Sequence, residues 1–262
     1  MRIGAQFYTV KDFTKDLKSF DETLKKVADI GFKTVQISGT CDFNAAWLRD
    51  KLKEYGLKCV LTHTAPDKLI NATEYVIEDH RTFGCDHIGL GAMPYLWNSE
   101  VSMEKVVSDF KETFIPVAEK IRDAGMHFMY HNHDLEFTKT PDGKRTYYDV
   151  LIDEIDPSLM GFTVDTYWIQ AGGEDPADMI RRLKGRCPKV HFKDYKILRG
   201  GDPALRLAAC GDGNLNFEKI AEACEYAGVE DILIEQDNCY GEDPFECLER
   251  SYKYLKSLGI EK

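Results

Sequence analysis

The segment GMHFMYHNH at residues 125–133 contains the unit that is repeated along this chain. Gly125 is placed to end a helix in the left-handed conformation, and an apolar run follows it directly. The run ends in polar residues, of which His131 and His133 lie two positions apart and share one face of an extended strand. Before Gly125, apolar residues between 107 and 121 recur every three or four positions, which predicts an amphipathic helix.

Seven further apolar runs have the same form as this one. Each is short and rich in β-branched or aromatic residues, which is typical of buried parallel strands. They are RIGAQF from Arg2, TVQIS from Thr34, KCVLTH from Lys58, HIGLG from His87, GFTVD from Gly161, KVHFKD from Lys189 and ILIEQ from Ile232. Eight strands that alternate with eight amphipathic helices over about 250 residues predict a (β/α)8 TIM barrel.

An open, doubly wound sheet is the alternative arrangement of such units. Its dinucleotide-binding loop needs three glycines in a fixed pattern, but GLGAMP at Gly89 lacks the third. GDGNLN at Gly211 has no strand before it, and no GxxxxGK[ST] phosphate loop occurs. We therefore expect one barrel domain over residues 1–262, because no Pro- or Ser-rich linker divides the chain.

Charge and composition narrow the partners that we expect. The chain has 45 acidic and 34 basic residues, and a net charge of −11 disfavours nucleic acid as a partner. The sequence has no apolar run long enough to span a membrane, and MRIGAQFYTV at the start does not have the pattern of a signal peptide. The eight cysteines are scattered and form no CxxC pair, which indicates reduced thiols. We expect a cytoplasmic protein with no membrane partner, for which a homo-oligomer is possible.

Polar residues gather at the carboxyl ends of the predicted strands, the end that carries the chemistry in TIM barrels. They are Gln6, Tyr8, His63, His131, His133, Asp165, His191, Lys193 and Glu235. Strand alternation directs His191 and Lys193 to one face, and it directs Glu235 inward. Mixed Asp, Glu and His sets bind Mn²⁺, Co²⁺, Zn²⁺ or Mg²⁺. Each residue alone is equally compatible with a packing or capping role, but four equivalent strand ends favour a metal site.

Five motifs lie on or after the last four predicted strands. They are YHNHDLEF from Tyr130, VDTYW from Val164, HFKD from His191, GDGNLNF from Gly211 and IEQD from Ile234. In order and spacing they resemble the sugar phosphate isomerase/epimerase family, over nearly the whole chain. The resemblance implies the xylose-isomerase-like TIM barrel fold. It also implies one divalent metal ion, with Mn²⁺ as the first choice, and the ligands would be His131, Asp165, His191 and Glu235.

One position departs from the pattern of that family. Many of its epimerases have glutamate where this chain has His131, so that two facing glutamates exchange protons with the substrate. Only Glu235 remains of that pair, which leaves metal-assisted enolisation or dehydration open. We expect Glu235 to be the general base and Lys193 to stabilise an oxyanion or relay a proton. His133 could be an alternative ligand or could contact the substrate.

Further residues are candidates for substrate binding at the barrel mouth. Gln6, Tyr8 and His63 follow or end predicted strands, and His63 could bind a hydroxyl or simply pack. Trp97 and Trp168 are expected in loops, where they would stack on a sugar or cover the rim. Arg199 and Arg206 follow the seventh strand, where Arg206 could bind an anionic or hydroxyl group and a solvated loop is the alternative. The remaining histidines are expected to be structural: His80, His87 and His127.

These residues lead to one function and its alternatives. We expect an enzyme that moves a proton next to the carbonyl of a sugar, sugar phosphate or keto-polyol, through an enediolate that the metal stabilises. Isomerisation, epimerisation and inosose-type dehydration share this first step. A metal-dependent DNA-repair endonuclease of the same fold is the alternative from another class, and it would need several zinc ions and a basic surface. A non-catalytic sugar-binding subunit is a third.

Overall fold

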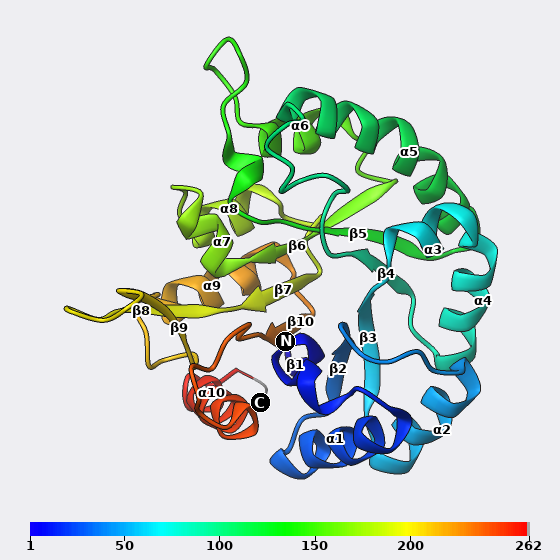
Figure 1. Ribbon diagram of the computed structural model, residues 1–262, viewed down its shortest axis with the longest axis vertical. Coiled ribbons are helices and arrows are strands. Elements are labelled where there is room, and N and C mark those ends of the chain that lie inside the picture. The colour runs from blue at the N-terminus through cyan, green and yellow to red at the C-terminus, as the bar shows by residue number, and fades with distance from the viewer. Residues whose placement is uncertain (261–262) are drawn as a thin grey trace.

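The eight predicted strands form a closed parallel barrel in a computed structural model that describes residues 1–260. The order around the barrel is β1-β10-β7-β6-β5-β4-β3-β2, as Figure 1 shows. The bounds are Arg2–Gln6 for β1, Thr34–Ile37 for β2, Lys58–His63 for β3, His87–Leu90 for β4, His127–His131 for β5, Met160–Asp165 for β6, Lys189–Phe192 for β7 and Asp231–Ile234 for β10. The TIM barrel prediction is confirmed.

The helices cover the outside of the barrel. Their bounds are Leu17–Ile30 (α1), Ala45–Tyr55 (α2), Pro66–Asn71 (α3), Thr73–Phe83 (α4), Met103–Asp123 (α5), Tyr147–Glu154 (α6), Thr166–Ala171 (α7), Pro176–Arg182 (α8), Phe217–Ala227 (α9) and Pro244–Ser257 (α10). Two short 3-10 helices follow β1 and β5: η1 at Phe7–Phe13 and η2 at Leu135–Phe137.

The prediction of eight helices was wrong for residues 1–260, because two units contain a second, short helix. The α3 helix precedes α4 after β3, and α7 precedes α8 after β6. Both α3 and α7 have six residues, which is too short for a recurring apolar period to identify them. The α7 helix begins directly after β6, because the Asp165 carboxylate accepts a hydrogen bond from the Trp168 N–H at 3.0 Å.

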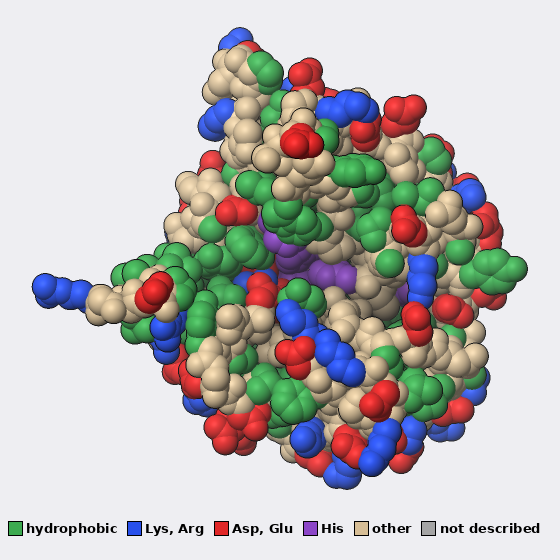
Figure 2. Space-filling view, viewed as in Figure 1, with side chains coloured by type: hydrophobic (Ala, Val, Ile, Leu, Met, Phe, Trp, Pro, Cys, Tyr) green, Lys and Arg blue, Asp and Glu red, His purple; other side chains and the backbone are tan. Residues whose placement is uncertain are grey.

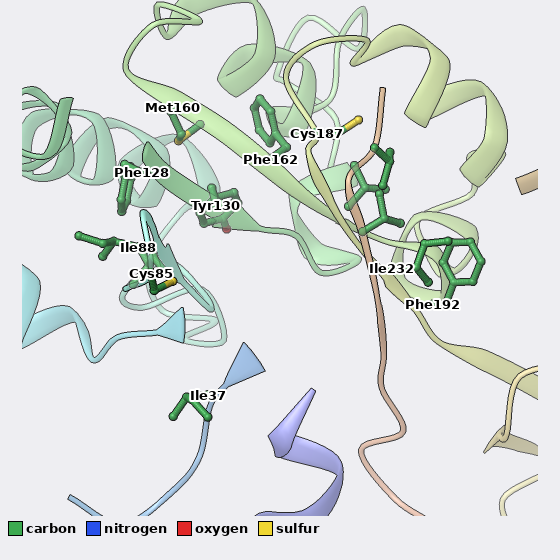
Figure 3. Packing of buried hydrophobic residues seen from close by; sticks show 14 of the residues in the cluster. Ile37, Cys85, Ile88, Phe128, Tyr130, Met160, Phe162, Cys187, Phe192 and Ile232 are labelled. Carbon is green, nitrogen blue, oxygen red and sulfur yellow. The ribbon is translucent and has the colours of Figure 1, made fainter. Parts of the chain in front are cut away.

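Alternation along the strands separates two apolar regions. Outward side chains such as Phe128 and Tyr130 of β5 belong to the large core between barrel and helices, part of which Figure 3 shows. There Phe128 stacks on Phe114 of α5, with ring centroids 6.1 Å apart. Inward side chains such as Met129 and Leu233 form a small separate cluster with Leu61 and its chain neighbour Val60. This inner cluster fills the interior of the barrel next to the polar strand ends, so the polar side chains lie on a layer of packed apolar side chains.

The segment after β7 is a β-hairpin rather than the loop that the sequence predicted. Strands β8 (Asp194–Ile197) and β9 (Leu205–Ala208) pair antiparallel, and Figure 1 shows the hairpin extending away from the barrel. The GDGNLN motif folds back on the base of this hairpin. The Asp194 carboxylate accepts hydrogen bonds from the N–H groups of Gly211 and Gly213, at 3.1 and 3.0 Å. A Cβ at Gly213 would lie 2.3 Å from Asp194 Oδ1, so only glycine fits.

The hydropathy of the helices and the state of the cysteines agree with what the sequence predicted for them. No helix within residues 1–260 is long and apolar enough to cross a membrane. All eight cysteines lie in this part of the chain and are free thiols, of which six are buried.

Candidate metal centre and active site

Four buried side chains converge at the carboxyl end of the barrel. His131 ends β5, Asp165 ends β6, His191 lies in β7, and Glu235 directly follows β10. One ligand atom from each lies within 4.8 Å of every other, so the four residues could hold a metal ion. Figure 2 shows histidine side chains at the bottom of a hollow in the centre of this face.

Hydrogen bonds to neighbouring groups orient the two histidines. His131 Nδ1 lies 3.1 Å from the carbonyl oxygen of Gly91, which can only accept, so this nitrogen carries the proton. His191 Nε2 lies 2.6 Å from Gln36 Oε1 and donates to it in the same way. In the neutral ring, the other nitrogen then has a lone pair that faces the centre, where His131 Nε2 lies 3.4 Å from Asp165 Oδ2 and His191 Nδ1 lies 2.8 Å from Glu235 Oε2. This is the arrangement in which neutral imidazoles bind metals.

Two atoms of the centre are buried without a hydrogen-bond partner. They are His191 Nδ1 and Glu235 Oε2, of which Glu235 Oε2 still forms an ion pair with Lys193 Nζ at 3.0 Å. These atoms are 2.8 Å apart, but their mutual geometry is not that of a hydrogen bond. Unsatisfied buried polar atoms are costly, and a divalent cation between them would satisfy both.

The charge of the centre is not balanced by its own residues. Lys193 is buried, and its Nζ lies 2.9 Å from Asp165 Oδ2, 3.0 Å from Glu235 Oε2 and 3.1 Å from Asp237 Oδ2. With these three carboxylates ionised, one ammonium leaves an excess of two negative charges. A divalent cation would neutralise that excess, so the donor set and the charge both fit such an ion.

Burial and the contacts with charged neighbours shift the pKa values of Lys193 and Glu235 in opposite directions. Burial alone would lower the pKa of Lys193, but Asp165, Glu235 and Asp237 outweigh it and raise that pKa well above its ordinary value. Burial raises the pKa of Glu235, yet Lys193 and His191 outweigh it and hold the pKa well below the ordinary value. Glu235 is therefore a carboxylate and Lys193 an ammonium.

Asp237 behaves differently from Glu235 although only one residue separates them. Burial raises its pKa, Lys193 counteracts this effect in part, and Glu235 adds to it, so that the pKa reaches about 6. Asp237 also lines the pocket above the centre. Among the three carboxyl groups around Lys193, Asp237 is the one whose pKa is raised, whereas the pKa values of Asp165 and Glu235 are lowered.

A pocket of about 870 Å³ opens above the four converging residues. Of the predicted residues, those in its wall are Tyr8, His63, His131, His133, Trp168, Lys193 and Glu235. Trp97 also lines the pocket, from the loop after β4, and its ring lies 5.0 Å from that of His133. Trp168 lies on α7 rather than in a loop, because Asp165 starts that helix at the strand end.

Two predicted substrate-binding residues lie elsewhere. Gln6 is fully buried behind Glu235, to which its Nε2 donates a hydrogen bond at 3.2 Å, so it orients Glu235 and does not line the pocket. Arg206 lies in β9, where it donates to the carbonyl oxygen of Asp202 and stacks over Tyr240. Arg199 is in the same hairpin, and neither arginine lines the pocket.

The other three histidines pack against or hydrogen-bond to neighbouring residues, as expected for structural residues, and one of them also lines the pocket. His87 and His127 contact each other with tilted rings at the starts of β4 and β5, with centroids 4.8 Å apart. His80 on α4 hydrogen-bonds Thr62 and the carbonyl oxygen of Val76. It also forms part of the pocket wall, which its position outside the strands did not indicate.

Three residues of the site were missed by the sequence analysis. Asp237 lies two positions after Glu235, and this spacing could have indicated it. Gln36 is a polar residue inside an apolar run, which also could have indicated an inward position. Glu136 is fully buried and accepts hydrogen bonds from the Tyr130 hydroxyl and the His133 N–H, at 2.6 and 3.1 Å. Only its place in the fold identifies Glu136 as a support for the end of β5.

Comparisons with known proteins agree with this architecture. The chain is 22% identical to an inosose dehydratase of Bacillus cereus, over 91% of this chain and 89% of that protein. A solved sugar phosphate isomerase/epimerase from Parabacteroides distasonis matches with a TM-score of 0.79 and 21% identity, over 98% of this chain and 94% of that one. The structure of the IOLI protein with a binding zinc atom matches with a TM-score of 0.71 and 12% identity, over 98% of both chains.

The family follows from a match that covers most of the chain. A sequence model of the family described as Xylose isomerase-like TIM barrel matches residues 24–258. These residues include all four converging side chains and seven of the eight barrel strands. The protein therefore belongs to the Xylose isomerase-like TIM barrel family.

Proposed function

We propose that this protein is a metal-dependent enzyme that moves a proton next to the carbonyl group of a sugar or keto-polyol. The observation that carries the proposal is the centre itself. Two imidazole nitrogens and two carboxylates face one point, and three carboxylates surround the one Lys193 ammonium beside it. The pocket above this point is large enough for a small carbohydrate.

His131, Asp165, His191 and Glu235 would hold the metal ion. We propose Mn²⁺ first, and Mg²⁺, Co²⁺ or Zn²⁺ as alternatives, because carboxylates and imidazoles suit all four. When bound, the ion supplies Lewis acidity that stabilises negative charge on a substrate oxygen. The zinc named for the IOLI protein supports a metal in this fold.

The side chains of the chain itself would perform the proton transfer. Glu235 is ionised and lines the pocket, so it can accept a proton from a carbon next to a carbonyl. The Lys193 ammonium lies 3.0 Å from Glu235 and can stabilise the oxyanion that forms when that proton leaves. His133 and Trp168 line the same pocket and would contact the substrate.

Dehydration of a keto-polyol is the second candidate reaction. In this reaction one base removes the proton from the carbon next to the carbonyl. The neighbouring C–O bond then breaks, and the hydroxide takes a proton from an acid and leaves as water. A single base on one face of the substrate is therefore sufficient. Lys193 is the protonated group beside Glu235 that could supply this proton. The likeness to an inosose dehydratase over 91% of the chain supports this candidate, as does His131 in place of a second glutamate.

Other properties of the protein follow from this proposal. Eight free cysteines suit a reducing compartment, and we propose the cytoplasm. The substrate would be a small molecule, and assembly as a homo-oligomer is compatible with it. Within residues 1–260 a single group of metal-binding residues occurs, which counts against a DNA-repair endonuclease with several zinc ions.

Metal uptake and hydrogen exchange test the proposal together. We expect elemental analysis to find one divalent ion per chain after incubation with Mn²⁺ and dialysis, and much less in His131→Gln. The metal-loaded protein, incubated with keto-sugars and keto-polyols in D₂O, should incorporate deuterium next to the carbonyl or release water, as followed by NMR. Glu230→Gln, at the opposite end of the barrel, is the matched control and should behave like the natural protein. A protein that takes up no metal and exchanges no hydrogen would contradict the proposal.

A further inference from the structure

The pocket is larger than the metal centre and a simple sugar require. Its volume is about 870 Å³. A six-carbon sugar occupies roughly 200 Å³, which is the volume of about seven water molecules in the liquid. Pockets of roughly 300–1,000 Å³ hold ligands of drug size. Space therefore remains after a monosaccharide is placed on the centre.

The additional space extends from the centre to the α4 helix, where apolar side chains form part of its wall. We call this part the outer lobe, and the residues that define it are Cys41, Phe43, Pro66, Val76 and Phe83. Val76 and Phe83 are buried side chains of α4, and the Phe83 ring packs edge-on against Phe43 with centroids 6.4 Å apart. The polar wall residue His80 is already bonded to Thr62 at 2.8 Å. An apolar group would gain more than a polar one by entering this lobe.

Three exposed aromatic residues line the pocket near its rim. Tyr8, Tyr95 and Trp97 are 36, 66 and 64% exposed, so packing in the core does not explain them. Tyr95 has a φ of 63°, a left-handed conformation that is rare for residues with a large side chain. Such backbone strain is concentrated at ligand-binding positions. The rim is therefore built to present aromatic surface to a ligand.

The charges of the wall do not suit an anionic ligand. Among residues 1–260, the pocket wall has two cationic side chains, Lys68 and Lys193. Lys68 pairs with Asp42 at 2.8 Å, and Lys193 is held among three carboxylates. Asp79 adds a further negative charge to the wall. A phosphate group would meet carboxylates here and no unpaired cation.

We propose that the substrate is an unphosphorylated carbohydrate that carries an apolar substituent, and that the outer lobe binds this substituent. The proposal rests on the proposed function for the polyhydroxy half, which would lie on the metal centre. The substituent would fill the part of the pocket volume that a monosaccharide leaves empty, and it would contact the apolar side chains of the outer lobe. A phosphate group is disfavoured because both cations of the wall are already paired with carboxylates. The rim aromatics would cover the bound molecule.

Matched pairs of methyl and phenyl glycosides test this proposal. The pairs would be those of D-glucose, D-galactose, D-mannose and D-xylose, with D-glucose 6-phosphate as the anionic probe. Binding to the metal-loaded protein is measured by saturation-transfer NMR and by tryptophan fluorescence, since Trp97 and Trp168 line the pocket. We expect at least one phenyl glycoside to bind about 10- to 100-fold more tightly than its methyl partner, as burial of one aromatic ring provides. The phosphate should not bind measurably.

Variants that fill the lobe identify where the phenyl group binds. Val76→Phe should abolish the phenyl preference and leave methyl glycoside binding unchanged. Tyr75→Ala, on the same helix but 79% exposed and outside the pocket, is the matched control. If Val76→Phe does not fold, Cys41→Leu fills the same lobe at a half-buried position that tolerates bulk more easily.

The outcomes separate this proposal from the proposed function. If no pair shows a phenyl preference, whether or not the methyl glycosides bind, the proposal is overturned. A phenyl preference that survives the lobe-filling variants, or measurable binding of the phosphate, would overturn it as well. Metal uptake and hydrogen exchange are measured separately, so they can support the proposed function even when the glycoside experiments overturn the proposal for the outer lobe. A phenyl preference without either of them would support the lobe and contradict the proposed reaction.

Discussion

Two ionic clusters lie at opposite ends of the same two strands, and they differ in completeness. At the lower end, Lys189 begins β7 and Asp231 begins β10. Their side chains lie 2.7 Å apart, and Arg2 makes a two-point contact with the same aspartate at 2.7 and 2.8 Å. Glu230 also pairs with Lys189 at 2.7 Å, so two cations meet two anions.

At the upper end, four residues further along each strand, Lys193 and Glu235 form the second cluster. Three carboxylates surround this one ammonium, and the buried atoms His191 Nδ1 and Glu235 Oε2 make no hydrogen bond. No buried atom of the lower cluster lacks a partner in the described chain. Removing one member of the closed cluster would leave a buried charge without a partner, which destabilises the fold. The open cluster has excess negative charge that a cation can neutralise, which is typical of a functional site. The comparison therefore distinguishes the structural end of the barrel from the functional end.

Asp231→Asn should have the largest effect on stability, because it opens the closed cluster. Arg2 and the buried Lys189 would lose their shared carboxylate, which costs about 3 kcal/mol when a buried pair is broken. Urea denaturation would measure this loss, while metal uptake by the folded protein should not change. Glu230→Gln is the control and should cost less than about 1 kcal/mol, because Glu230 is 56% exposed. Unchanged stability in Asp231→Asn would show that the lower cluster is not a stabilising element.

Glu235→Gln is the corresponding change in the open cluster, and we expect the opposite pattern. The metal-free protein should lose less stability than Asp231→Asn, because Lys193 keeps two carboxylate partners, Asp165 and Asp237, after the change. Turnover should fall about 100-fold or more, as when a general base is lost. Metal occupancy must be measured beside activity, since Glu235 is also a proposed ligand. A variant that keeps its metal and near-normal turnover would show that another group, with Lys193 or His133 next in line, is the base.

The pH dependence of stability provides a smaller test at His80, a buried group with both ring nitrogens bonded. Burial lowers the pKa of His80 from 6.5 to about 4. The unfolded chain therefore binds a proton at a higher pH than the folded chain. The resulting stability is present above about pH 6.5 and is lost as the pH falls towards 4.

Urea denaturation at about pH 7.5 and at about pH 5 would measure this loss. Between these values, the natural protein should lose about 2 kcal/mol more than His80→Gln. Equal losses in the two proteins would show that His80 titrates normally in the folded state.

Much of the fold was predictable because it depends on local patterns. Apolar runs of four to six residues formed all eight barrel strands, since a strand buried on both faces needs such a run. Alternation also placed His191 and Lys193 inward, because successive side chains of a strand point to opposite faces. The hairpin after β7 was not predicted, because its two strands are stabilised by pairing with each other and lie outside the barrel.

The sequence by itself determined the barrel and the strand ends that carry His131, Asp165, His191 and Glu235, because period and spacing are properties of the chain. Only the tertiary structure decided what surrounds them. Gln36 contacts His191 across 155 positions of sequence. The outer lobe likewise joins α4 to the loop after β2 and to the start of α3, while Arg206 donates to Asp202 and does not line the pocket. Such contacts arise when distant segments pack, and no local pattern in the sequence encodes them.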